Sequence, residues 1–156
     1  MRIGVPKEIK PQENRIGLTP DSVKTLVSEG HEVLVENNGG FEAGFDNDQY
    51  KNAGARIIEK AADIFNDAEI IVKVKEPQKV EVEMIRENQI VYTYLHLAAA
   101  KELTEGLVKS KSINIAYETI TDDNGRLPLL APMSAVAGRM SVQAGAHCLE
   151  KNQKGR

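Results

Sequence analysis

The sequence predicts an α/β fold with a mainly parallel sheet and flanking helices. Short runs rich in Val and Ile alternate with segments of helical periodicity along most of the 156 residues. This alternation is typical of βαβ units. Turn-forming stretches such as Asn-Asn-Gly-Gly at 37–40 separate the segments. The expected sheet is therefore of the Rossmann-like or flavodoxin-like kind, in which helices cover both faces.

Seven segments have the apolar, β-branched character of strands. The predicted strands are residues 3–6, 31–36, 56–58, 70–75, 89–95, 113–117 and 127–130. The segment 70–75 is the strongest of them, and Pro77 ends it because proline cannot donate a ladder hydrogen bond. Lys73 and Lys75 lie two positions apart in this segment, so a regular strand places both on one face.

The first helix is predicted to begin at Thr19 and Pro20. A hydroxyl N-cap there precedes a proline at a position where its missing N–H costs nothing. Val23, Leu26 and Val27 follow at helical spacing and form its buried stripe. Further helices are predicted over residues 48–53, 80–85 and 101–109.

A long helix is predicted near the end of the chain, from Ser134 as its N-cap to about Glu150. Small residues recur in it at every fourth position, which allows another backbone to approach closely. The last six residues are polar and offer no core of their own. We therefore expect a domain over residues 1–133, followed by an interdomain helix and a truncated end over residues 134–156.

Charge and composition exclude several classes of protein. Twenty Lys and Arg face 23 Asp and Glu, a net charge of −3, which gives no basic face for nucleic acid. The single cysteine, Cys148, excludes an internal disulfide framework and a cysteine zinc site, and we expect no metal centre. No apolar run is long enough to span a bilayer, and no secretory leader is visible. A cytoplasmic protein is expected.

Candidate functional residues follow the predicted strands. Ligands of open α/β sheets collect beyond the carboxyl ends of the strands. Arg15 follows the first strand, Lys75 ends the strongest one, and His96 comes directly after the next. Met133 and Ser134 stand where the last predicted strand gives way to the long helix. These five residues are the candidates for a site.

Two cations and an imidazole suit a small carboxylate whose reaction needs proton transfer. Arginine grips a carboxylate bidentately, and a lysine ammonium polarises a second oxygen. An imidazole exchanges protons in either direction near neutral pH. The alternatives are ordinary: a solvated Arg15, an edge lysine at Lys73 or Lys75, and a core histidine at His96.

The common phosphate and hydrolase signatures are absent from the sequence. It contains no G-x-G-x-x-G after a strand, no P-loop, no H-E-x-x-H and no G-x-S-x-G. A serine at a helix N-terminus, such as Ser134, can donate to a phosphate, although most such serines only cap the helix.

Five short motifs are specific in combination. They occupy residues 3–8, 13–20, 72–77, 94–98 and 130–134. Together they resemble the N-terminal part of the alanine dehydrogenase/pyridine nucleotide transhydrogenase family, over essentially the whole chain. The resemblance is stronger to the alanine dehydrogenase branch, because Lys-Glu-Pro at 75–77 and Leu-His-Leu at 95–97 are both present.

The resemblance implies an activity and a role for each candidate. The reaction would be the reversible conversion of L-alanine, NAD and water to pyruvate, ammonia and NADH. Arg15 and Lys75 would bind the substrate carboxylate and keto oxygen, and His96 would act as the acid/base group. Met133 would line the pocket, and Ser134 would contact the nicotinamide cofactor. The full-length enzyme would be a homo-oligomer.

The same resemblance implies that this chain is incomplete as an enzyme. Family members continue into a dinucleotide-binding domain, so the isolated chain is expected neither to bind NAD tightly nor to turn over. Two alternatives stay open. One is a transhydrogenase-type subunit fragment, and the other is a non-catalytic module that binds a small carboxylate or a partner.

Overall fold

The computed structural model describes residues 1–155 and divides the chain into two compact units. The first unit is Met1–Ala116, and the second begins at Tyr117. The two are described separately below. Among residues 1–155, no helix has both the length and the apolar character needed to cross a membrane.

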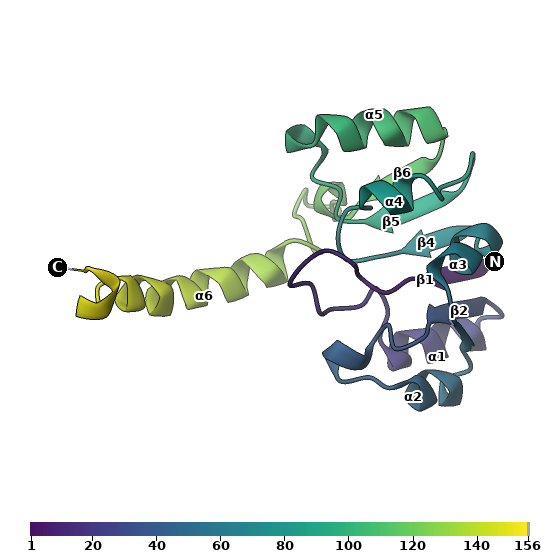
Figure 1. Cartoon of the computed structure of the whole chain (residues 1–156), viewed down its shortest axis with the longest axis horizontal. Coiled ribbons are helices and arrows are strands. Elements are labelled where there is room, and N and C mark those ends of the chain that lie inside the picture. Colours follow the sequence, from purple (N-terminus) through teal and green to yellow (C-terminus); the bar gives the residue numbers. More distant parts are fainter. Residues whose placement is uncertain (156) are drawn as a thin grey trace. The chain divides into compact units, whose positions relative to one another are not determined.

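The first unit is built on one six-stranded sheet in which every pair of neighbours is parallel (Figure 1). The strands are β1 (Arg2–Val5), β2 (Glu32–Glu36), β3 (Arg56–Ile58), β4 (Ile70–Val72), β5 (Ile90–Thr93) and β6 (Ile113–Ala116). Their order across the sheet is β3-β2-β1-β4-β5-β6. The predicted α/β class with a mainly parallel sheet is confirmed.

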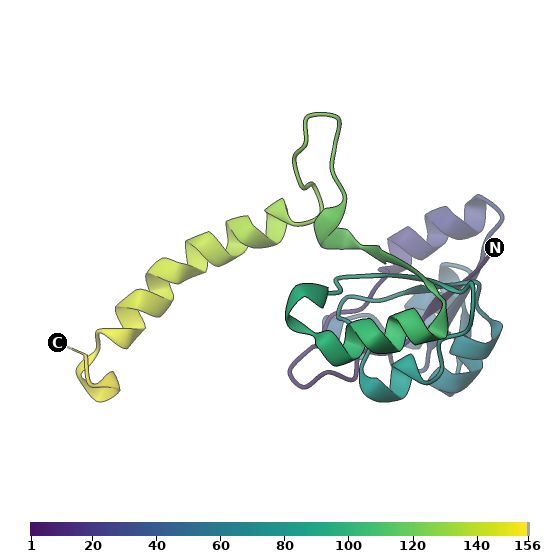
Figure 2. The same cartoon turned by 90° about the horizontal axis from the view of Figure 1, so that it is seen from above.

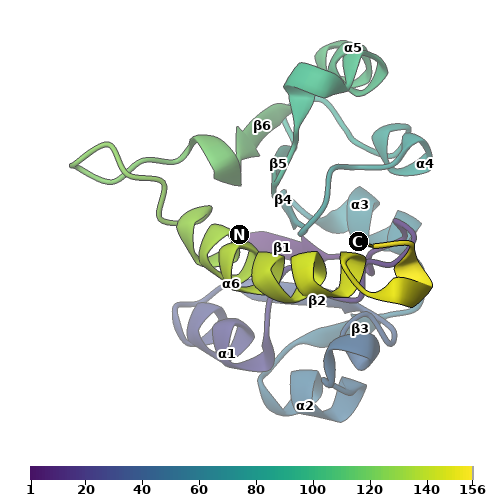
Figure 3. The same ribbon diagram turned by 90° about the vertical axis from the view of Figure 1, so that its left-hand side faces the viewer.

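Five α-helices connect these strands. They are α1 (Pro20–Ser28), α2 (Asn47–Asn52), α3 (Ala61–Asp67), α4 (Lys79–Val82) and α5 (Lys101–Ser110). The apolar core forms two layers: side chains of α1 and α2 belong to one, and those of α3 and α5 to the other. Figure 3 shows α1 on the opposite side of the strands from α3 and α4.

Successive side chains of a strand point to opposite faces of the sheet, so neighbouring residues pack in different layers. Val33 and Val35 of β2 pack in the first layer, while Leu34 between them packs in the second. α3 lies very close to the central strand at Gly4, where an added Cβ would come within 2.5 Å of Ile64 Cγ2. Glycine at this position therefore allows the helix to reach the sheet.

The helix starts agree with the sequence only in part. At α1, Thr19 accepts a hydrogen bond from the Ser22 amide at 3.4 Å, so the predicted N-cap is confirmed. The helix α3 was not predicted, because its seven residues, Ala61–Asp67, carry no capping side chain to mark the start.

The predicted strand 127–130 is wrong. Its backbone turns instead, and the Leu130 amide donates to the Leu127 carbonyl at 3.1 Å.

The second unit contains the long helix α6 (Ala131–Cys148), preceded by an extended loop (Figure 2). The predicted capping role of Ser134 is wrong, because α6 begins three residues earlier with Pro132 in its first turn. Ser134 is helical, and its hydroxyl donates to the Leu130 carbonyl at 3.3 Å. The short 3-10 helices η3 (Tyr117–Thr119) and η4 (Lys151–Gln153) complete this unit.

Candidate functional site

The candidate site lies at the carboxyl edge of the sheet, where the strand order reverses. From β1 the chain builds outward through β2 and β3, and then returns to place β4 on the other side of β1. Open parallel sheets bind ligands outside the strand ends at such a reversal. Arg15 follows β1, Lys75 follows β4 and His96 follows β5. The topology thus puts all three predicted residues on the same edge.

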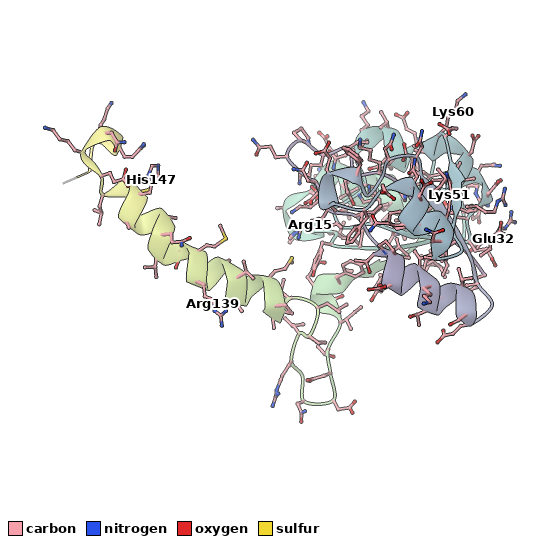
Figure 4. All side chains as sticks on the ribbon, turned by 90° about the horizontal axis from the view of Figure 1, so that it is seen from below. Arg15, Glu32, Lys51, Lys60, Arg139 and His147 are labelled. Atoms are coloured by element: carbon pink, nitrogen blue, oxygen red, sulfur yellow. The ribbon has the colours of Figure 1, made fainter. Side chains whose placement is uncertain are left out.

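Arg15 is held by a carboxylate two residues away. Its Nε donates to Glu13 Oε1 at 2.8 Å and its Nη2 donates to Glu13 Oε2 at 2.7 Å. The Glu13 side chain is only 7% exposed, whereas that of Arg15 is 50% exposed. Hydrogen bonding to the guanidinium lowers the pKa of Glu13 to about 2 and raises the pKa of Arg15. The arginine is therefore oriented but still accessible, as Figure 4 shows at the surface of the sheet unit.

The loop that carries Arg15 is anchored immediately after it. A Cβ at Gly17 would lie 2.5 Å from the Val72 carbonyl oxygen, so the loop touches the end of β4 there. One residue further, the Leu18 carbonyl accepts a hydrogen bond from the Tyr50 hydroxyl at 2.8 Å. These contacts fix the path of the loop within three residues of Arg15.

Lys75 is half-buried, and its peptide group is held on two sides. Its amide donates to Glu8 Oε1 at 3.2 Å, and its carbonyl accepts from the Thr93 hydroxyl at 2.9 Å. The positive charge of Lys75 is one of the influences that lower the pKa of Glu13. Lys75 is thus within electrostatic reach of the pair formed by Glu13 and Arg15.

Lys73 has a different environment from Lys75. Its ammonium is fully buried, 3.1 Å from Glu8 Oε2 and 2.7 Å from Glu81 Oε1. Burial raises the pKa of Glu81. The predicted strand 70–75 is shorter in the structure, because β4 ends at Val72 and the backbone bends at residues 74 and 75. Lys73 is therefore an interior ion-pair residue, and Lys75 is the lysine that a ligand could reach.

His96 has a left-handed backbone, with φ 51° and ψ 37°, at the start of the 3-10 helix η2 (Leu97–Ala99). Its side chain is exposed, so it is not a core histidine. The ring stacks near Tyr94, with 6.4 Å between ring centroids and 22° between planes. Tyr94 in turn contributes to the raised pKa of Arg15. Tyr94 therefore lies near His96 and within electrostatic reach of Arg15.

Glu76 connects His96 to the same group of charges. Burial opposes the ionisation of Glu76, but a hydrogen bond from Lys10 and the charges of Lys10 and His96 outweigh it and lower the pKa of Glu76. The carboxyl edge therefore contains acidic partners for the cations that the sequence predicts.

Two hollows open near this edge. A small one of about 10 Å³ is lined by Arg15, Glu13 and Glu8, among others. A broad groove of about 900 Å³ runs between α4 and α5 and begins at Glu76. Neither hollow is lined by Arg15, Lys75 and His96 together.

Met133 and Ser134 belong to the second unit and are described within it alone. Both lie in the first turns of α6, where Met133 is half-buried and Ser134 is exposed.

Sequence reasoning missed the acidic residues of the edge. Glu8 and Glu13 both lie in motifs singled out above, but neither was predicted to orient Lys75 or Arg15. For Glu13 a signal was available, because it stands two residues before Arg15. Glu8 had none, because its partners are more than 60 residues away in the sequence.

The reversal point does not fit a dinucleotide. β1 is followed by Pro6, Lys7 and Glu8 instead of a glycine turn, and α1 begins only at Pro20. The connection between β1 and α1 is therefore not the short glycine turn that brings a pyrophosphate onto a helix N-terminus. The carboxylate of Glu8 in this connection is buried and paired with the ammonium of Lys73.

Comparison with known proteins places the chain in a family. Residues 4–137 match the family model described as "Alanine dehydrogenase/PNT, N-terminal domain". An alanine dehydrogenase of Halomonas elongata is 55% identical over 155 residues, which are 99% of this chain and 42% of that protein. An alanine dehydrogenase of Geobacillus stearothermophilus is 51% identical over 156 residues, again 42% of its length.

Solved structures agree with these relatives. An L-alanine dehydrogenase structure matches the whole chain with a TM-score of 0.92 and 52% identity, over 43% of its own length. A transhydrogenase from Sinorhizobium meliloti is more distant, with a TM-score of 0.72 and 28% identity over 77% of this chain. The chain spans about two fifths of the length of these alanine dehydrogenases. It belongs to the alanine dehydrogenase/PNT N-terminal domain family.

Proposed function

We propose that this chain is the substrate-binding part of an NAD-dependent alanine dehydrogenase. The reaction converts L-alanine, NAD and water reversibly to pyruvate, ammonia and NADH. The observation that carries the proposal is made at the carboxyl edge of the sheet, where Lys75 lies within electrostatic reach of the oriented Arg15 and its partner Glu13. Relatives about half identical to the chain are named alanine dehydrogenase, which supports the same function.

In this proposal Arg15 and Lys75 bind and orient the substrate. A guanidinium forms two parallel hydrogen bonds with a carboxylate, and its attachment to Glu13 limits the directions in which it can do so. The ammonium of Lys75 neutralises and polarises the keto oxygen of pyruvate. Holding the carboxylate group and the keto oxygen, which are both attached to Cα, fixes that carbon, and such orientation supplies a large part of enzymatic acceleration.

His96 is the proposed acid/base group. Its exposed ring can exchange protons with a ligand and with solvent as the carbinolamine and imine steps require. The left-handed backbone at His96 and the nearby Tyr94 ring restrict where the imidazole can point. Restriction of that kind serves a group that must meet one atom of a bound substrate.

The proposal extends to the second unit and to the whole enzyme. Met133 lines the substrate pocket and Ser134 contacts the nicotinamide cofactor. Residues 1–133 form the substrate domain and residues 134–156 the interdomain helix, of which residue 156 lies outside the described part. The full-length protein is cytoplasmic and homo-oligomeric, and NAD is held mainly by segments that the longer relatives have in addition.

Two alternatives make different predictions. A transhydrogenase-type fragment needs no amino-acid pocket, and the lower identity to the transhydrogenase structure disfavours it. A non-catalytic interaction module would not depend on Arg15 or Lys75 for binding a small acid.

Calorimetric titration of the 156-residue chain with pyruvate tests the proposal. We expect binding that weakens at least about tenfold in Arg15→Ala and in Lys75→Ala, the usual cost of losing a hydrogen bond to a charged group. Arg56→Ala is the matched control, because Arg56 is an exposed, ion-paired arginine at the amino end of β3. Binding that is indifferent to the first two substitutions, or no binding at all, would contradict the proposal.

A second measurement addresses activity. The chain alone should produce no NADH from L-alanine and NAD. Production of NADH by the purified 156-residue chain would show that the expectation of inactivity is wrong.

A further inference from the structure

Glu8 makes an unusual set of contacts for a carboxylate. Its side chain is 2% exposed, and it follows β1 by only three residues. One oxygen, Oε1, accepts from the Val74 amide at 2.6 Å and from the Lys75 amide at 3.2 Å. The other oxygen, Oε2, accepts from the ammonium of Lys73 at 3.1 Å.

The reason for these contacts is the divergence of two neighbouring strands. β1 and β4 pair through Ile3 and Gly4, and β1 ends at Val5, directly before Pro6. Proline has no N–H, and the described pairing of β1 with β4 does not extend beyond β1. The amides at the end of β4 would therefore lose their partners on that side. The carboxylate of Glu8 replaces the missing strand.

The opposite side of the same segment is held by β5. The Lys73 amide donates to the Tyr92 carbonyl at 3.1 Å, and the Tyr94 amide donates to the Val74 carbonyl at 3.3 Å. The Thr93 hydroxyl then donates to the Lys75 carbonyl. The peptide of Lys75 is thus fixed from β5 by a hydroxyl and from the β1 side by Glu8.

Lys73 fixes Glu8 in its turn. The buried ammonium bridges Glu8 and Glu81, so the carboxylate of Glu8 cannot rotate away from the two amides without leaving Lys73 with a single partner. Breaking a buried ion pair is strongly unfavourable. Contacts within the protein therefore hold the backbone of residues 73–75 in place without a ligand.

We infer that Glu8 is a positioning residue for Lys75. It acts through the backbone of Lys75 and presents the lysine ammonium to the bound acid. The inference rests on the proposed function, because a role for Lys75 in binding is what gives this positioning its purpose. Glu8 itself need not touch the ligand.

A double-mutant cycle on the 156-residue chain tests the inference, with the dissociation constant of pyruvate as the readout. We expect Glu8→Gln to weaken binding about tenfold when Lys75 is present, the usual worth of a charge-assisted hydrogen bond. In a Lys75→Ala background the same change should have at most about a twofold effect. An equal fold-change in the dissociation constant of pyruvate in both backgrounds would show that Glu8 does not act through Lys75 and would overturn the inference.

Glu69→Gln is the matched control. Glu69 is also a carboxylate that accepts from a backbone amide, that of Arg2 at 2.6 Å. It is exposed and directly precedes the amino end of β4, whereas Glu8 binds the segment after the carboxyl end. Its effect on pyruvate affinity should be small and the same with or without Lys75.

Amide hydrogen exchange supplies a readout that needs no ligand. Glu8→Gln should speed exchange at Val74 and Lys75 at least about tenfold, while core amides such as that of Val91 stay unchanged. If the wild-type chain does not bind pyruvate, the proposed function fails, and exchange alone decides the role of Glu8. Unchanged exchange at both amides would overturn that role.

Glu8→Asp covers the case in which Glu8→Gln does not fold. It keeps the charge beside Lys73, but the shorter side chain withdraws the carboxylate from the amides of Val74 and Lys75. It should show the same faster exchange and the same dependence on Lys75. Normal exchange in a folded Glu8→Asp variant would contradict the inference.

Discussion

Replacing Lys73 with methionine is the perturbation whose cost the structure defines best. The ammonium is completely buried between two carboxylates that are each 2% exposed, at 3.1 Å and 2.7 Å. Removing one member of a buried ion pair costs about 3–5 kcal/mol, because the remaining charge loses its compensation. Here two carboxylates, Glu8 and Glu81, would be left facing the same cavity. We expect a loss of unfolding free energy in that range at pH 7.

Urea unfolding followed by circular dichroism at 222 nm measures this loss, since the chain has no tryptophan to report by fluorescence. With an m value of about 2 kcal/mol per molar, the midpoint should fall by about 2 M. Lys51→Met is the control, because Lys51 pairs with Asp48 at 3.0 Å while both side chains are more than half exposed. An exposed pair contributes at most about 1 kcal/mol.

The loss of unfolding free energy in Lys73→Met should depend on pH because of the same two carboxylates. Burial already raises the pKa of Glu81, and removing the cation raises it further. The folded variant then binds more protons than the unfolded chain, so its stability falls as the pH rises. The loss of unfolding free energy caused by Lys73→Met should therefore be smaller at pH 5 than at pH 7. Equal losses in Lys73→Met and Lys51→Met would refute the reasoning.

Three further outcomes follow from individual residues. Gly4→Ala should cost about 1–3 kcal/mol of unfolding free energy by overpacking against α3, whereas Gly138→Ala, whose Cβ meets nothing within 4 Å, should not destabilise the protein in the same urea assay. The folded pKa of Glu13, about 2, lies below its ordinary 4.5, so the stability that Glu13 adds is present above pH 4.5 and is lost toward pH 2. Thermal unfolding of Glu13→Gln should accordingly differ from wild type by about 1–2 kcal/mol at pH 7 and converge with it near pH 2. In the full-length enzyme His96→Ala should lower kcat about 10²–10⁴-fold at saturating alanine, and an unchanged kcat would contradict an acid/base role.

The sheet was largely predictable because each of its strands is a local signal. Runs of Val and Ile bounded by turn residues predict β1 to β6 within a few residues of their observed bounds. The predicted strand 127–130 is wrong because three leucines are compatible with a strand, but whether they form one depends on a neighbouring strand that the local sequence does not show. In addition, Pro128 removes one of the amides that strand pairing needs. The helix α3 was missed for lack of any capping side chain.

The places of the candidate residues on the sheet edge were predictable, whereas those of the neighbouring carboxylates were not. The position of Arg15, Lys75 and His96 after strands is visible in the sequence, because parallel strands end at one edge. The difference between Lys73 and Lys75 was not, since it depends on where β4 stops and bends. The partners Glu8 and Glu81 come from segments far apart in the chain, and only the folded sheet brings them to Lys73.

The anchored loop after β1 has a consequence for the thermodynamics of recognition. Contacts at Gly17 and Leu18 and the bidentate grip of Glu13 immobilise Arg15 before any acid arrives. Freezing a long, rotamer-rich side chain upon association ordinarily costs about 0.5–1.5 kcal/mol. The contacts of Arg15 reduce this entropic cost before association, so under the proposed function a molecule with as few atoms as pyruvate would keep more of the energy of its contacts as affinity.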